Sequence, residues 1–346
     1  MDVPLKSPTN LARSEHPQPL DSPLSWPLHE LAIELTVRCN LSCEMCSVWQ
    51  GQRDGVDQAL ARDVLASGRR LGATSFVPTG AESFMRRDFL SLLEYAHELG
   101  YQRQEVVTNG TLLFKHLDRL AGVPTVRLHV SIDGPEPIHD RLRGKGVYER
   151  AVAGVRGAVE RGISVGLSGV LMRPTLDTAE HIIDLAVSLG LQEVSFQPFQ
   201  PEIAGSQRLH DEWTFSAEDR LFVADRLQAI REYARAAGVN IYSESIFGEI
   251  IPYLFDGVRP IPPGGCFMPS RFLLIDVNGE AFPCFFMRET AIGNVLKGDR
   301  LEDLWHNPVQ LRLQVVALSS KCPGCLAACS DIASYEMDQA RLGARG

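Results

Sequence analysis

Short apolar, β-rich runs alternate with stretches of helical periodicity between about residues 31 and 199. The runs predict six strands, at 31–37, 74–79, 104–108, 126–132, 164–171 and 193–199. The intervening stretches predict helices at about 58–71, 86–99, 147–161 and 177–189. Six strand-then-helix units favour a parallel sheet with right-handed crossovers. The expected fold class is therefore α/β, a partial (β/α)6 TIM-like barrel that falls short of the eight units of a closed barrel.

The rest of the chain predicts a long helix, a linker and a small second domain. The helix is expected at 215–237, with Thr214 or Ser216 as its cap and Gly238 as its end. A Pro/Gly-rich segment at 257–265 indicates a boundary near 240–260. A hairpin with Asn278-Gly279 as a type I′ turn and a helix at about 300–316 predict a small α+β domain. The domains expected are an arm (1–28), the barrel (29–240), the small domain (255–335) and a tail (336–346).

Composition and charge narrow the class of protein. The 346 residues are 45% hydrophobic and 22% charged, which is ordinary for a globular protein with a core. A net charge of −9 disfavours binding of a nucleic-acid backbone by charge. No apolar run has the length of a membrane span, and the N-terminus lacks the apolar stretch of a signal peptide. We therefore expect a cytoplasmic protein with no membrane and no nucleic-acid partner.

Eight cysteines fall in two groups at opposite ends of the chain. The first group is Cys39, Cys43 and Cys46, and the second is Cys266, Cys284, Cys322, Cys325 and Cys329. In a reducing compartment such clusters indicate metal more often than disulfides. The first group has the spacing C-x3-C-x2-C and directly follows the first predicted strand, at the end of the barrel where active sites lie. Three thiolates suit a [4Fe–4S] cluster whose fourth iron has no protein ligand, whereas a structural zinc normally takes four ligands.

This cysteine loop resembles that of the radical S-adenosylmethionine (SAM) superfamily, and the resemblance covers about residues 31–200. It implies that the open iron binds SAM and that an electron from the cluster cleaves it to a 5′-deoxyadenosyl radical, which abstracts a hydrogen from the substrate. Thr79-Gly80-Ala81-Glu82 stands where the family has a GGE-type turn, with Ala81 in place of the second glycine. Thr108-Asn109-Gly110 and Ser131-Ile132-Asp133-Gly134 follow the third and fourth strands, as in the family.

The same resemblance implies a set of SAM contacts. An arginine downstream of the fourth strand binds the SAM carboxylate in the family, and two parallel hydrogen bonds favour arginine over lysine there. The residue before the third cysteine contacts adenine, and here it is a methionine. The implied contacts are Met45, Gly80, Ala81, Glu82, Asn109, Ser131, Asp133, Arg143, Ser168 and Gln197.

The second cysteine group resembles the twitch or SPASM extension of radical SAM enzymes, which carries auxiliary [4Fe–4S] clusters. Five cysteines are too few for the two clusters of a full SPASM domain, so one auxiliary cluster is expected. Its implied ligands are Cys266, Cys284, Cys322 and either Cys325 or Cys329. A hairpin followed by C-x2-C is also a zinc-ribbon pattern, and zinc is the alternative at this site.

The function that we expect is modification of a small natural-product metabolite, of the sugar, aminocyclitol or nucleoside type, by oxidation, epimerisation or cyclisation. SAM and two [4Fe–4S] clusters are the cofactors, and a flavodoxin or ferredoxin type of protein is the electron donor. The alternatives are maturation of a ribosomally made peptide and a non-catalytic iron–sulfur carrier or sensor. We name no catalytic acid or base, and Glu34, Trp49, His129, Phe199 and Glu202 lie near strand ends without an assigned role.

Overall fold

One continuous sheet organises the described part of this computed structural model, which comprises residues 26–200, 210–242, 244–258, 266–318 and 325–326. Within it, ten strands lie in the order β10-β9-β8-β1-β2-β3-β4-β5-β6-β7. β1 to β7 run parallel, β8 pairs parallel with β1, and β9 pairs antiparallel with both β8 and β10. The bounds are β1 Glu30–Thr36, β2 Ser75–Gly80, β3 Arg103–Thr108, β4 Val126–Ser131, β5 Ser164–Leu171, β6 Glu193–Pro198, β7 Asn240–Ile241, β8 Phe272–Ile275, β9 Glu280–Phe282 and β10 Gly293–Asn294.

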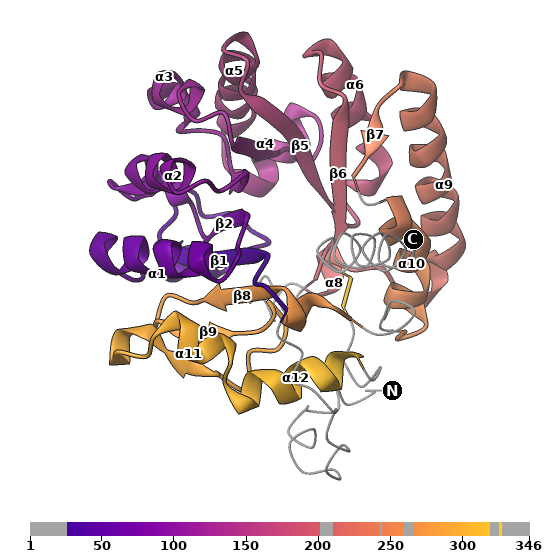
Figure 1. Cartoon of the computed structure of the whole chain (residues 1–346). Coiled ribbons are helices and arrows are strands. Elements are labelled where there is room, and N and C mark those ends of the chain that lie inside the picture. The colour runs from indigo at the N-terminus through magenta and orange to yellow at the C-terminus, as the bar shows by residue number, and fades with distance from the viewer. Residues whose placement is uncertain (1–25, 201–209, 243, 259–265, 319–324, 327–346) are drawn as a thin grey trace, which may run out of the picture.

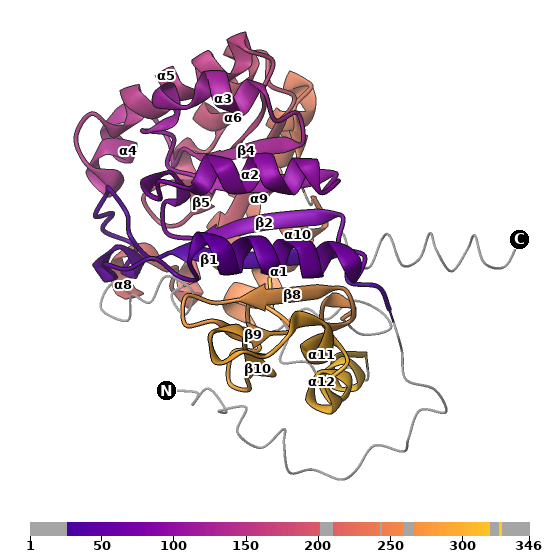
Figure 2. The same cartoon turned by 60° about the vertical axis from the view of Figure 1, so that its left-hand side comes forward.

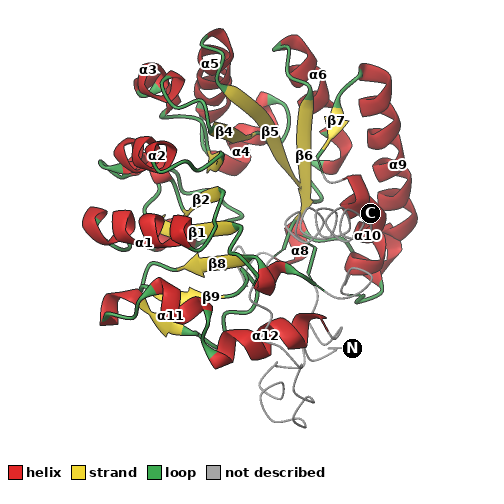
Figure 3. Cartoon of the chain, in the orientation of Figure 1, coloured by secondary structure: helices red, strands yellow, loops and turns green. Residues whose placement is uncertain are grey.

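Most of the described helices line the outer side of the curved sheet, as Figures 1 and 3 show. Their bounds are α1 Gln58–Arg70, α2 Phe89–Glu98, α3 Leu117–Ala121, α4 Glu136–Arg143, α5 Val147–Glu160, α6 Glu180–Ser188, α8 His210–Trp213, α9 Arg220–Ala237, α10 Glu244–Phe255, α11 Leu301–Trp305 and α12 Pro308–Leu318. The six predicted strands and the four helices between them are confirmed. The fold is the expected partial barrel of mixed α/β class, lengthened by the short β7 and by β8.

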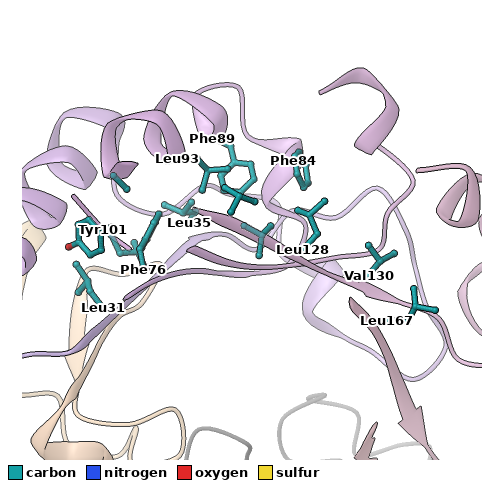
Figure 4. Close-up of a cluster of buried hydrophobic side chains, with 14 of the residues drawn as sticks. Leu31, Leu35, Phe76, Phe84, Phe89, Leu93, Tyr101, Leu128, Val130 and Leu167 are labelled. Carbon is teal, nitrogen blue, oxygen red and sulfur yellow. The ribbon is translucent and has the colours of Figure 1, made fainter. Parts of the chain in front are cut away.

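The main core lies between the outer face of the sheet and the helices (Figure 4). Leu31 and Leu35 of β1 point to this side, and so does Phe76 of β2, because alternate strand residues face the same way. Tyr101, which is also buried there, donates its hydroxyl to the Leu65 carbonyl of α1 at 2.8 Å. The complementary residues of each strand therefore face the inner side of the barrel.

The C-terminal hairpin joins the barrel directly through β8, as both Figures 1 and 2 show. The hairpin itself is confirmed, but the predicted type I′ turn is wrong. The Gly279 N–H donates to the Asp276 carbonyl, so Val277 and Asn278 are the central residues and Gly279 follows with φ +74°. The Asp276 carboxylate accepts the Asn278 and Glu280 N–H groups, both at 2.8 Å, and this shifts the turn by one residue.

Two predicted helices differ in their bounds. The long helix α9 begins at Arg220, after a short 3-10 turn that Ser216 and Asp219 close as a capping box, and it ends at Ala237 with Gly238 as its C-cap. The helix predicted at about 300–316 is two helices, because Pro308 has no N–H to continue the first. Most of the predicted boundary region holds α10, and 259–265 lie outside the described residues. The division into arm, barrel, small domain and tail stays a prediction.

Candidate iron–sulfur and SAM site

The loop that carries Cys39, Cys43 and Cys46 begins directly after β1, at the carboxyl end of the sheet. Cys43 is buried and the other two cysteines are half-buried. The Glu44 N–H donates to the Leu142 carbonyl of α4 at 2.9 Å, and the Cys46 N–H donates to the Cys43 carbonyl at 3.2 Å. The three predicted ligands therefore lie on one short segment that backbone hydrogen bonds fix in place.

The chemistry of these thiols fits an iron–sulfur cluster. Burial raises the pKa of Cys43 to about 11, a rise that Arg143 opposes and that Cys39 and Cys46 increase. Burial also raises the pKa of Cys39, as do the charges of Glu82 and Cys46. Among the described residues, these three thiols included, no three metal-ligating side chains are gathered closely enough to form a metal site, so the fit rests on the number and spacing of the cysteines. Sulfurs that repel one another as anions suit a group that supplies iron cations and binds thiolates.

The turn at Gly80, Ala81 and Glu82 lies against the start of the cysteine loop. The Ala81 N–H donates to the Thr36 carbonyl at 2.8 Å, and the Glu82 N–H donates to the Arg38 carbonyl at 3.0 Å. Gly80 has φ +115°, and a Cβ there would lie 2.1 Å from the Thr36 carbonyl oxygen. Only glycine fits this position. The Ala81 and Glu82 N–H groups already donate to the cysteine loop and the end of β1. We therefore expect that any backbone contact of this turn with SAM is made by its carbonyl groups.

We expect Gly80→Ala to destabilise the protein more than a matched glycine replacement does. Gly162 has φ +69°, and a Cβ added to it would meet nothing within 4 Å, so Gly162→Ala costs only the backbone strain, about 1–2 kcal/mol. The contact of the Gly80→Ala methyl group with Thr36 adds about 1–3 kcal/mol. Anaerobic denaturant unfolding of the two variants measures the difference. Equal losses would show that the turn relaxes away from Thr36.

Glu82 links this turn to the end of β3 from a fully buried position. Its carboxylate accepts the Thr108 hydroxyl at 2.9 Å and the Asn109 N–H at 2.9 Å, and it also accepts the Phe84 N–H at 3.4 Å. Burial raises the pKa of Glu82 to about 7, although these hydrogen bonds oppose the rise. Glu82 thus connects the turn after β2 to the end of β3 through hydrogen bonds, and its predicted contact with SAM stays a proposal.

A side-chain network ties Asn109 to the cysteine loop. The Asn109 amide donates to the Asn40 side chain at 3.0 Å and lies 3.9 Å from the Cys39 sulfur. Asn40 in turn donates to the Thr111 hydroxyl at 2.9 Å, which donates to the Asn109 side-chain oxygen at 2.6 Å. Asn40 and Thr111 were not predicted from the sequence, although Asn40 lies within the cysteine motif and Thr111 directly follows Thr108-Asn109-Gly110.

Asp133 and Arg143 form a buried ion pair beside the same loop. The Arg143 Nε and Nη2 groups donate to the two Asp133 carboxylate oxygens at 2.5 and 3.3 Å. Burial alone lowers the pKa of Arg143, but the charge and hydrogen bonds of Asp133 raise it above its ordinary value. The Asp133 N–H donates to His139 Nδ1 at 3.2 Å, a contact that the spacing of His139 and Arg143 on α4 could have suggested. The two predicted SAM contacts thus bind each other here.

Of the four remaining predicted SAM contacts, three lie on the neighbouring strands β4, β5 and β6, and the fourth, Met45, lies in the cysteine loop. Ser131 pairs in register with Ser168, and Gln197 pairs with Val170 two residues further along the same strand. All three alternate with outer-core residues, so they face the inner side of the sheet. Met45 is 6% exposed and belongs to an apolar cluster that also contains Cys43, Leu142, Met172, Phe199 and Trp213. Its predicted contact with adenine stays a proposal.

Two of the second group of cysteines lie near the C-terminal hairpin. Cys266 and Cys284 are buried, and Cys266 packs with Phe272, Leu274 and Phe282. Cys325 is half-buried, and the carbonyl of the next residue, Leu326, accepts the buried Gln200 amide at 3.0 Å just beyond β6. This bond ties the last described cysteine to the barrel. Cys322 and Cys329 lie outside the described residues, so the ligand set of the auxiliary cluster stays a prediction.

Comparison with known proteins assigns both parts of the chain. Residues 33–186 match the family model of the radical SAM superfamily, and residues 266–329 match that of an iron–sulfur cluster-binding domain, SPASM. A probable GTP 3′,8-cyclase of Saccharolobus solfataricus is 25% identical over 301 residues, which cover 80% of this chain and 90% of the relative. A pre-heme d1 synthase of Dinoroseobacter shibae is 24% identical over 335 residues, which cover 90% of this chain and 82% of the relative.

The crystal structure of Streptococcus suis SuiB bound to the precursor peptide SuiA shows the same fold, with a TM-score of 0.68 and 19% identity over 84% of this chain and 67% of that one. Among the described helices, none combines the length and apolar character that a membrane span needs. From the two family matches and the cysteine loop at the end of β1, we conclude that the chain belongs to the radical SAM superfamily, has a C-terminal SPASM-type domain, and uses SAM and [4Fe–4S] clusters as cofactors.

Proposed function

We propose that this radical SAM enzyme oxidises, epimerises or cyclises a small natural-product metabolite of the sugar, aminocyclitol or nucleoside type. The observation that carries the proposal is the polar inner face of the sheet next to the cysteine loop. Ser131, Ser168 and Gln197 face that side near the strand ends. Val107 is 56% exposed there, although its strand lies between two others. An open face with many hydrogen-bonding groups suits a polyhydroxylated ligand.

The residues of this chain hold and orient the cofactors in the proposed enzyme. Cys39, Cys43 and Cys46 would hold the first cluster. Arg143 binds Asp133 through its Nε edge, so its remaining N–H groups would bind the SAM carboxylate. Cys266, Cys284, Cys322 and one of Cys325 and Cys329 would hold a single auxiliary cluster. When bound, the first cluster and SAM supply the one-electron chemistry that removes a hydrogen atom from the substrate.

The names of the relatives support a small-molecule substrate without identifying it. The Saccharolobus relative is named for the cyclisation of GTP, and the Dinoroseobacter relative for the synthesis of a heme precursor. An electron donor of the flavodoxin or ferredoxin type and a cytoplasmic location, without a nucleic-acid partner, belong to the same proposal. A peptide substrate is the outcome that would replace it.

The experiment is an anaerobic assay of the reconstituted full chain with SAM and dithionite. The panel contains GTP, a nucleotide sugar, an aminocyclitol and a cysteine-containing peptide, each labelled with deuterium at carbon. The expected result is that one of the three metabolites raises the yield of 5′-deoxyadenosine and transfers deuterium to it. Transfer from the peptide alone would contradict the proposed substrate class, and an absence of SAM cleavage would contradict the enzyme assignment in this chain.

A further inference from the structure

A second polar group on the inner face of the sheet lies apart from the cofactor site. Its centre is Glu105 on β3 and His129 on β4, with 2.6 Å between the glutamate Oε2 and the histidine Nε2. Their sequence neighbours Val106, Leu128 and Val130 belong to the outer core, so alternation places Glu105 and His129 on the inner face. The two side chains are 24% and 16% exposed, so both remain accessible.

The position of His129 along its strand brings it toward the cofactor site. Ser131 lies two residues further on the same face, about 7 Å closer to the carboxyl end of the strand. On the other side of His129, Arg127 forms an ion pair with Glu193 near the beginnings of β4 and β6. The ring of Tyr242 lies 6.4 Å from that of His129. Along the strands, the Glu105–His129 pair therefore lies between the Arg127–Glu193 ion pair and the proposed SAM site.

The hydrogen bond determines which histidine nitrogen is available for chemistry. Burial raises the pKa of Glu105, but the hydrogen bond with His129, the charge of that ring when it is protonated, and the charges of Arg127 and Arg103 outweigh this and leave the pKa below its ordinary value. An ionised carboxylate only accepts hydrogen bonds, so Nε2 carries the proton in this pair. In the neutral ring the lone pair is then on Nδ1, which makes no hydrogen bond with any described residue.

Gly166 leaves room beside this free nitrogen. It lies on β5 in register with His129, and a Cβ at this position would be in van der Waals contact with the Glu193 carbonyl oxygen at 3.8 Å, Arg127 Nη2 at 3.9 Å and His129 Nδ1 at 4.0 Å. Gly166 does not have a positive φ, and no neighbouring atom would clash with a Cβ there, so neither reason explains a glycine at this position. Glycine also lowers the stability of a strand interior. A strand glycine of this kind often marks the close approach of a ligand.

We infer that His129 is a catalytic residue that accepts a proton from a hydroxyl group of the substrate, with Glu105 as its positioning residue. The O–H bond of the substrate breaks, its electron pair stays on oxygen, and the proton forms a bond to Nδ1. The Glu105 carboxylate stabilises the resulting imidazolium through the Nε2 proton, as in other carboxylate–histidine pairs. The inference rests on the proposed function, because it requires a hydroxylated substrate on the inner face.

The first test needs no substrate. The anaerobic holoenzyme is treated with diethyl pyrocarbonate, which acylates accessible imidazole nitrogens, and its peptides are analysed by mass spectrometry. His129 should react, with exposed His97 as the reactive control and fully buried His139 as the unreactive one. Gly166→Leu should slow labelling of His129 at least tenfold and leave His97 unchanged. The inference would be overturned if His129 did not react in the wild type, or if Gly166→Leu left the rate of His129 labelling unchanged.

The second test uses the metabolite that the wild type turns over in the panel above. His129→Ala should lower kcat at least about 100-fold, the size of a general-base contribution. Added imidazole should restore at least a tenth of the lost activity, and Glu105→Gln should lower kcat about tenfold with KM unchanged. Unchanged kcat in His129→Ala, or a loss that imidazole does not rescue, would refute the role. If the wild type turns over none of the metabolites, the proposed function is wrong. The inference about His129 is then judged by the labelling experiment, which tests whether Nδ1 is accessible.

Discussion

Cys46→Ala is expected to abolish SAM cleavage and to lower the iron content from roughly eight to about four atoms per chain after anaerobic reconstitution. The reason is the donor set, since the loop supplies three thiols and has no fourth cysteine to replace a lost one. A cluster with two protein ligands is lost, and SAM loses its site with it. The same result is expected for Cys39→Ala and Cys43→Ala. Iron analysis and chromatography of 5′-deoxyadenosine measure both effects.

Cys284→Ala is the matched control for this experiment. Cys284 is buried near the C-terminal hairpin and belongs to the proposed auxiliary site. Its replacement should also remove about four irons, but it should spare SAM cleavage in part while it stops substrate turnover. If Cys46→Ala formed 5′-deoxyadenosine at the normal rate, the proposed role of the N-terminal loop would be wrong. A wild type with only about four irons would remove the auxiliary cluster from the proposal.

Asp133→Asn is expected to lower the free energy of unfolding by about 3–5 kcal/mol, the usual cost of removing one partner of a buried ion pair. Asp133 is fully buried, and the Arg143 side chain is only 11% exposed. Asparagine keeps the shape of the side chain but leaves the guanidinium without its counter-charge. It also weakens the acceptor for the Val170 N–H, which donates to the same carboxylate at 3.2 Å. Anaerobic denaturant titration of the reconstituted protein measures the change.

Asp118→Asn provides the comparison on the protein surface. Asp118 also pairs with an arginine, Arg161, at 2.8 Å, but its side chain is 90% exposed. Water and salt screen such a pair, so its loss should cost less than about 1 kcal/mol. The contrast between the two variants isolates the effect of burial. Similar losses in both would mean that Arg143 finds another partner in the reconstituted enzyme, such as the thiolates of the cluster.

The sequence predicted the barrel well because each strand places apolar residues on the side that packs against the helices, and the helices between the strands have an apolar face of their own. It missed α4, because the Pro135-Glu136-Pro137 segment resembles a turn although a proline is acceptable in the first turn of a helix. It also placed the hairpin turn one residue late. Local propensity favours Asn278-Gly279, but the buried Asp276 carboxylate organises the loop through two N–H groups.

The sequence predicted which loops form the candidate site, because each motif directly follows a strand, but it did not predict which side chains bind each other there. The cysteine spacing and the Gly80–Glu82 turn indicated which loops meet at the carboxyl end of the sheet. The partners within that site depend on three-dimensional packing, so Asp133 and Arg143 were assigned to SAM and not to each other. The pairing of Glu105 with His129 depends on the register between β3 and β4, which places Val107 opposite His129. No local pattern in the sequence reveals that register.

The parallel pairing of β8 with β1 also determines how the chain can be divided. Residues Glu30 to Ile33 bond on one side to Ser75–Pro78 and on the other to Phe272–Ile275. A fragment that stops before β8 would expose a row of unpaired backbone N–H and C=O groups along β1. Such edges recruit strands from other molecules. A fragment that ends before Phe272 is therefore expected to self-associate and precipitate, and a fragment suited to expression has to extend through the C-terminal hairpin.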